Sequence, residues 1–103
     1  MKFALLTVTY GGLFYKGEAL SLEQQIYKAK ALGFDALAIE TKRPVASPLD
    51  LSKADRNRIK SIATDEGLPL CAVESMSNLA AGIWKKGRTI LPLCAWCLRW
   101  QKI

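Results

Sequence analysis

The sequence predicts an α/β fold in which two helices connect three parallel strands in the order β-α-β-α-β. The first observation is a repeated interval, because Glu40 lies seven residues after Gly33 and Glu74 lies seven residues after Gly67. The second is that each glycine follows an apolar helical stripe and precedes a short apolar run. These features indicate two helix–strand junctions with the two glutamates at equivalent depths on adjacent strands.

The first predicted unit runs from the N-terminus to Glu40. Residues 3–9 are continuously apolar or rich in β-forming residues, which is typical of a buried strand, and a glycine-containing loop follows. Ser21 and Gln24 form a capping box that opens a helix, and Gly33 ends it. The predicted strand 36–40 follows directly. The apolar face of this helix is predicted to contain Leu22, Ile26, Ala29 and Leu32.

The second predicted unit has the same layout. A polar connection with prolines at positions 44 and 48 leads to Ser52, which pairs with Asp55 as a second capping arrangement. Gly67 ends the helix and the strand 70–74 follows. The predicted buried face contains Ile59, Ile62 and Ala63, and the predicted solvent face contains Lys53, Arg56, Arg58 and Lys60.

Two architectures are built from such units, a doubly wound open sheet and a (β/α)₈ TIM barrel. A complete barrel usually needs about 250 residues, so this 103-residue chain could supply less than half of one. The pattern changes at residue 79, where a third helix should begin. We therefore divide the chain into residues 1–78, with the βα pattern, and an atypical C-terminal tail, 79–103, that is either a docking segment or not native to the fold.

The charge distribution limits the classes of partner. The chain has a formal charge of +6, but residues 1–81 hold ten Lys or Arg and nine Asp or Glu, so the excess lies in the tail. The tail contains all three tryptophans, yet it has no periodic stripe that would favour nucleic acid or a membrane. Three cysteines, an odd number, do not form a disulfide framework. We expect a cytoplasmic protein without nucleic-acid or membrane partners.

Glu40 and Glu74 are the main candidate catalytic residues. Active sites of α/β folds form at the carboxyl ends of strands, and two carboxylates there could share a cation or divide acid and base roles. The alternative is that each is a polar strand end paired with a neighbouring cation or N–H group. Candidate substrate-binding residues follow the same strands, although Arg43 could equally pair with an acid: Thr9, Tyr10, Arg43 and Asn78.

Other catalytic classes are disfavoured by the residues present. The chain has no histidine, which removes nucleophilic systems of the Ser-His and Cys-His kinds. Cys94 and Cys97 have the spacing of a redox or zinc motif, but zinc needs four ligands and only Cys71 remains. The context of Pro92 does not match a thioredoxin-type dithiol. These residues therefore do not predict a metal or redox site.

Several segments in order resemble the sugar phosphate isomerase/epimerase family, which has the xylose-isomerase-like TIM-barrel fold. The resemblance covers about residues 1–78 and is carried by the segments 21–24, 31–40, 43–44, 48–52 and 66–70. It implies metal-assisted proton transfer next to a sugar carbonyl, with Mn²⁺, Mg²⁺ or Zn²⁺. It also implies that Glu40 and the ends of the first and third strands border a pocket for a sugar or sugar phosphate.

The main metal ligands of that family lie on later strands, so we expect the isolated chain to be an inactive N-terminal portion. The metal-binding residues cannot be assigned from the sequence. The open sheet edges predict a second copy or a complementing chain as partner. The opposing hypothesis is a non-enzymatic binding module that uses the basic Trp/Cys tail.

Overall fold

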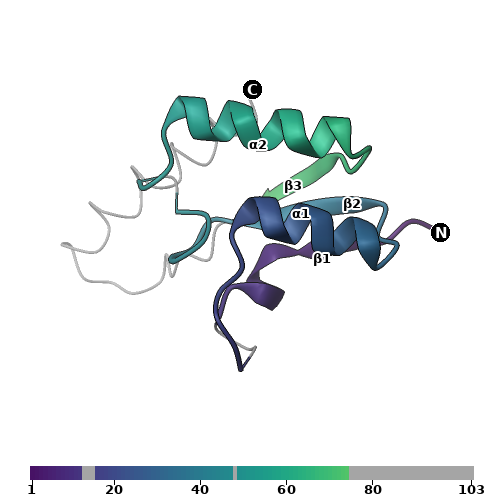
Figure 1. Ribbon diagram of the computed structural model, residues 1–103, viewed down its shortest axis with the longest axis horizontal. Helices are drawn as coiled ribbons and strands as arrows, with labels where there is room; N and C mark the ends of the chain where they lie inside the picture. The colour runs from purple at the N-terminus through teal and green to yellow at the C-terminus, as the bar shows by residue number, and fades with distance from the viewer. Residues whose placement is uncertain (13–15, 48, 75–103) are drawn as a thin grey trace, which may run out of the picture.

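A computed structural model describes residues 1–12, 16–47 and 49–74 of the chain, and these residues form an α/β fold (Figure 1). Its helices and strands are β1 (Ala4–Leu6), a 3₁₀ helix η1 (Thr7–Tyr10), α1 (Leu22–Ala31), β2 (Ala36–Glu40), α2 (Lys53–Asp65) and β3 (Leu70–Glu74). The strands form one parallel sheet in the order β1-β2-β3. The predicted element order and strand direction are confirmed. The predicted tail, 79–103, lies outside the described residues.

The two helices pack side by side and share one face of the sheet, as Figure 1 shows. This arrangement follows from parallel strands in sequential order, because right-handed crossovers place both connecting helices on the same side. The core between the layers includes Ile26 of α1, Leu37 and Ile39 of β2, and Ile59 of α2. An ion pair of 2.8 Å between Arg58 and Glu23 joins the helices at the surface.

Both helices begin with the predicted capping box. The Ser21 hydroxyl accepts from the Gln24 N–H at 3.3 Å, and the Gln24 side chain accepts from the Ser21 N–H at 2.8 Å. In α2, Ser52 and Asp55 form the same reciprocal pair, with distances of 3.1 and 2.9 Å. Each box satisfies N–H groups that the first helical turn leaves without a partner.

Both helices also end as predicted, on a glycine with positive φ. Gly33 has φ +82° and Gly67 has φ +64°. The next residue in each case donates its N–H back into the helix: Phe34 to the Ala29 carbonyl at 3.0 Å, and Leu68 to the Ala63 carbonyl at 2.8 Å. This is the Schellman arrangement, which turns the chain directly into the following strand.

The predicted strand 3–9 is wrong in its second half. The strand ends at Leu6, and residues Thr7–Tyr10 form the 3₁₀ helix instead. The physical reason is visible at the neighbouring strand, where the N–H of Glu40 donates to the Thr7 hydroxyl at 2.8 Å. A side chain therefore satisfies the donor that a longer strand would have bonded through its backbone.

Two predictions about the helix faces are also wrong. Leu32 is the C-cap of α1 and is 53% exposed, and buried Gln25 occupies the inner face together with Leu22, Ile26 and Ala29. Arg56 was predicted to face solvent but is only 6% exposed. Its guanidinium donates to the Leu51 carbonyl at 2.7 Å, which allows a charged side chain to lie in the interior.

Candidate functional site

The candidate site lies at the carboxyl ends of the strands, where Glu40 and Glu74 lie level with each other on neighbouring strands. The two residues are register partners on neighbouring parallel strands, one position beyond the pair Ile39 and Val73. Side chains alternate between the faces of a sheet. Because Ile39 and Val73 pack into the core beneath the helices, Glu40 and Glu74 belong to the opposite face. The predicted equivalent depth of the two glutamates is confirmed.

Glu40 occupies the central strand and is only 5% exposed. Its backbone is held from two directions. Its N–H donates to the Thr7 hydroxyl at 2.8 Å, and its carbonyl accepts from the Lys42 N–H at 2.9 Å. These bonds, one to Thr7 of η1 and one within the turn that follows β2, fix the backbone from which the buried carboxylate projects.

Glu74 has a different environment, because its side chain is exposed at the edge strand β3. Its carbonyl accepts two hydrogen bonds from Thr41, one from the backbone N–H at 2.9 Å and one from the hydroxyl at 2.8 Å. Thr41 therefore joins the ends of β2 and β3. This contact holds the backbone of Glu74 in place and leaves its carboxylate toward solvent.

A shallow pocket borders Glu40 at this end of the sheet. The site is open to solvent, and its empty space, including that open part, is about 250 Å³. Glu40 contributes the acidic group, Lys42 and Arg43 the cationic groups, and Thr7 a hydroxyl. The described residues that line it are Thr7, Val8, Gly11, Glu40, Lys42, Arg43 and Val45. Glu74 is not among them.

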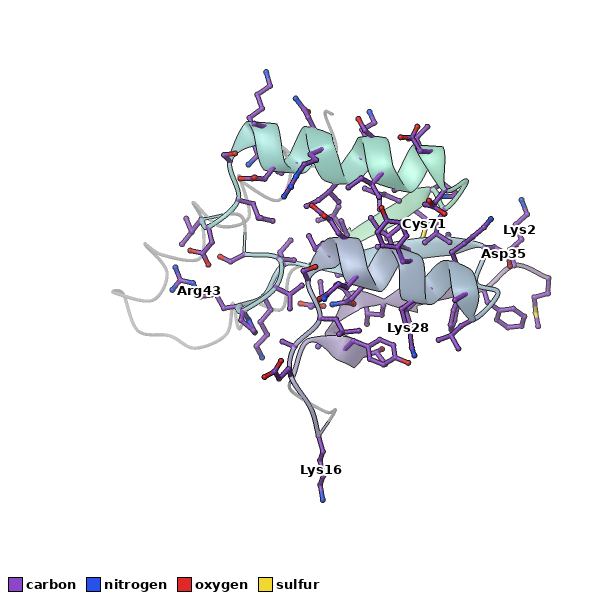
Figure 2. All side chains as sticks on the ribbon, in the orientation of Figure 1. Lys2, Lys16, Lys28, Asp35, Arg43 and Cys71 are labelled. Atoms are coloured by element: carbon purple, nitrogen blue, oxygen red, sulfur yellow. The ribbon has the colours of Figure 1, made fainter. Side chains whose placement is uncertain are left out.

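Arg43 lines the pocket but is committed to an ion pair. Its Nε and Nη2 atoms donate to the two carboxylate oxygens of Asp50 at 2.7 and 2.8 Å. The hydrogen bond to Asp50 raises the pKa of Arg43, and the same bond lowers the pKa of the Asp50 carboxyl. The Arg43 side chain is still 67% exposed, and Figure 2 shows it at the end of the sheet opposite Lys2 and Asp35. Both sequence readings of Arg43, pocket residue and partner of an acid, therefore have a structural basis.

Two of the remaining candidate substrate-binding residues, Thr9 and Tyr10, are not among the residues that line the pocket. Thr9 is exposed on η1, and Tyr10 is half-buried against the hydrophobic core. Asn78 lies outside the described residues. The sequence analysis ended the first strand at Thr9, whereas β1 ends three residues earlier, at Leu6.

Thr7 is a buried hydroxyl residue of the pocket that the sequence analysis missed. It was included in the predicted first strand, where a threonine needs no special role. The available signal was only general, because a threonine hydroxyl can hydrogen-bond backbone groups. Its contact with Glu40, 33 positions away, could not be recognised without the tertiary structure.

The pocket residues that the structure describes do not form a site for a divalent cation. Among the described residues no group of three or more His, Cys, Asp or Glu side chains comes together. Glu40 is the sole carboxylate among the described pocket residues, and Lys42 and Arg43 stand beside it. Hard divalent cations need several oxygen ligands, and neighbouring cations oppose them. The described part of the site is instead suited to a polar ligand that carries a negative group.

Two further findings concern the ability of the described helices to cross a membrane and the similarity of the chain to known proteins. No helix within the described ranges combines the length and the apolar character that crossing a membrane requires. Comparison with protein-family models, with curated proteins and with solved structures finds no match.

Proposed function

We propose that the chain binds a sugar phosphate at the carboxyl ends of its strands and belongs to an isomerase or epimerase of the type that its motifs resemble. The observation that carries this proposal is the buried carboxylate of Glu40 in a pocket that also contains Lys42 and Arg43. A carboxylate accepts hydrogen bonds from sugar hydroxyls, and lysine and arginine provide positive charge for a phosphate.

Glu40 also has the chemistry that the reaction would need. Isomerisation and epimerisation both remove a proton from the carbon beside a carbonyl. Isomerisation delivers a proton to the neighbouring carbon, whereas epimerisation returns one to the same carbon from the opposite face, and a positioned carboxylate is a suitable general base for the removal. In the proposal Glu40 takes this proton, and Lys42 and Arg43 hold the phosphate. Glu74 is exposed and does not line the pocket, so in the proposal it contacts at most the outer part of the ligand.

The barrel is part of the same proposal. Both helices cover one face of the sheet, and the opposite face carries Ala38 and Glu40 of β2, both buried. In a (β/α)₈ barrel, helices lie outside and the opposite sheet face lines the interior. On the sides away from β2, β1 and β3 pair with no other described strand. We propose that further strands of a longer chain, or a second copy, cover these edges.

A divalent cation (Mn²⁺, Mg²⁺ or Zn²⁺) is implied by the resemblance alone. The described pocket residues do not form a site for it, so its ligands would have to come mainly from outside them. We therefore expect this chain to bind a sugar phosphate without turning it over. The alternative of a non-catalytic module depends on residues 79–103, which the structure does not describe, and it stays a prediction.

The test is titration of the full chain with ribose 5-phosphate, followed by amide NMR and calorimetry. Glu40→Gln should weaken binding by about tenfold or more, since hydrogen bonds to a charged group contribute about 1.5–3 kcal/mol. Glu74→Gln is the matched control and should change the dissociation constant by less than about twofold, as expected of an exposed charge at the edge.

Three outcomes would contradict the proposal. One is a wild-type chain that does not bind ribose 5-phosphate, and another is equal loss of binding in Glu40→Gln and Glu74→Gln. The third concerns turnover: incorporation of solvent deuterium beside the sugar carbonyl, with Mn²⁺ or Mg²⁺ present, would contradict the expected inactivity of this chain.

A further inference from the structure

Thr7 combines three properties that bear on ligand binding. It is 2% exposed, it lines the pocket beside Glu40, and its hydroxyl oxygen accepts the Glu40 N–H at 2.8 Å. A threonine hydroxyl has one donor proton and two acceptor lone pairs. The backbone contact uses one lone pair and leaves the proton available.

Within the described part of the chain, no group accepts the Thr7 hydroxyl proton. A buried donor without an acceptor is unfavourable, because it has lost water and gained no replacement. The Glu40 N–H occupies one side of the oxygen, and Thr7 is one of the residues that line the pocket. An acceptor atom in the pocket would complete the hydrogen bonding of this hydroxyl.

The exposed fractions of the lining residues distinguish an inner and an outer end of the pocket. Thr7 and Glu40 are almost fully buried and form its floor. Lys42 is half-buried and Arg43 is exposed, so the cations form its rim. A ligand with a phosphate at one end and a sugar oxygen at the other matches this arrangement, with the phosphate outermost.

We propose that Thr7 donates its hydroxyl proton to a sugar oxygen of the bound ligand and thereby selects the sugar end of a sugar phosphate for the floor of the pocket. This inference rests on the proposed function and deepens it. Glu40 accepts from a neighbouring sugar hydroxyl, so the two side chains together recognise one donor and one acceptor on adjacent oxygens.

The test compares two probes, ribose 5-phosphate and inorganic phosphate, with the full chain and its variants. Thr7→Val removes the hydroxyl and keeps the shape, and it should weaken ribose 5-phosphate binding by about five- to tenfold, as expected for one hydrogen bond. Inorganic phosphate binding should change by less than about twofold. Thr7→Ser should restore most of the affinity for ribose 5-phosphate.

A matched control is Thr41→Val, which removes a hydroxyl whose proton is already donated to the Glu74 carbonyl. It should leave both affinities unchanged. The structural alternative, in which Thr7 only positions Glu40, is tested in the Glu40→Gln background. Direct contact predicts a further loss of about fivefold when Thr7→Val is added, whereas positioning alone predicts no further loss and would overturn the inference.

A measurement on the wild-type chain covers the case in which Thr7→Val does not fold. Both probes should shift the amide resonance of Lys42, and only ribose 5-phosphate should shift that of Thr7. Equal shifts at Thr7 with both probes would overturn the inference and leave the proposed function standing. Absence of ribose 5-phosphate binding by the wild type would overturn both.

Discussion

The two βα units, residues 21–40 and 52–74, are built from the same local devices but present their terminal glutamates differently. In each unit a serine caps the helix, a glycine ends it, and a short strand leads to a glutamate. Glu40 is nevertheless 5% exposed, and its register partner Glu74 is exposed. The same local sequence features therefore place the terminal glutamate in the pocket in one unit and on the surface in the other.

The similarity extends to a contact that no capping motif requires. The fourth helical residue of each unit is buried and donates from its side chain to the carbonyl of the residue before the serine cap. Gln25 bonds the Leu20 carbonyl at 3.0 Å, and Arg56 bonds the Leu51 carbonyl at 2.7 Å. The same backbone geometry at both helix starts accepts a neutral amide and a charged guanidinium.

The difference arises from position in the sheet. Strand β2 has neighbours on both sides and its end contacts η1, which contains Thr7, whereas β3 pairs only with β2 among the described strands. Burial of a glutamate depends on these neighbours and not on the residues that precede it. The following predictions test this comparison, beginning with the largest expected effect.

The effect of sheet position on core burial can be measured with the register partners Ile39 and Val73. Ile39 is fully buried, so Ile39→Ala should lower the free energy of unfolding by about 2–5 kcal/mol through lost burial and a cavity. Val73 is half-buried, and Val73→Ala should cost about 1 kcal/mol. Urea unfolding of both variants checks this. Equal costs would mean that β3 is as enclosed as β2.

The helix ends should, in contrast, behave alike. An added Cβ at Gly33 meets no atom within 4 Å, and at Gly67 it meets only the Lys30 ammonium nitrogen at 3.9 Å. The cost of an alanine therefore comes from the left-handed backbone alone, about 1 kcal/mol at each site. Gly33→Ala and Gly67→Ala should agree within about 0.5 kcal/mol in urea unfolding, and Gly33→Asn should cost less than Gly33→Ala. A marked inequality would show that one glycine has a further packing role.

The smallest effect is a pH difference between the two helix starts. Hydrogen bonds from Ser52 lower the pKa of the Asp55 carboxyl, while Gln24 at the matching position does not titrate. A lowered folded-state pKa gives stabilisation that is present above the ordinary aspartate pKa and lost as the pH falls through the folded value. Below about pH 4, amide exchange should accelerate at Asp55 and Arg56 relative to Gln24 and Gln25.

The control for this pH effect is Asp55→Asn, which keeps a short polar side chain and removes the titration. In that variant the exchange rates at the start of α2 should follow those at the start of α1 between pH 3 and pH 6, apart from intrinsic exchange chemistry, because neither capping residue would titrate. Persistence of the acid effect would assign it to another group, such as the Asp50 carboxyl paired with Arg43.

Several features could be predicted because neighbouring residues decide them. The capping boxes at Ser21 and Ser52, the positive φ at Gly33 and Gly67, and the strand 36–40 depend on contacts within a few positions. Of the errors at Thr7 and Arg56, one arises from a contact over 33 positions and the other from a side-chain bond over five positions. Thr7 lies outside β1, and its hydroxyl accepts the N–H of Glu40. Arg56 lies in the interior, where its guanidinium donates to the Leu51 carbonyl.

The sequence by itself determined where the helices begin and end, that the strands run parallel, and that two glutamates stand level at one end of the sheet. Caps, glycine turns and apolar periodicity act over one or two turns of chain, so they can be read directly. Only the tertiary structure decided that Glu40 is buried, that Glu74 is exposed, and that Thr7, Lys42 and Arg43 share a pocket with Glu40. Burial and pocket formation depend on residues more than 30 positions apart, and their proximity results from packing of the whole sheet.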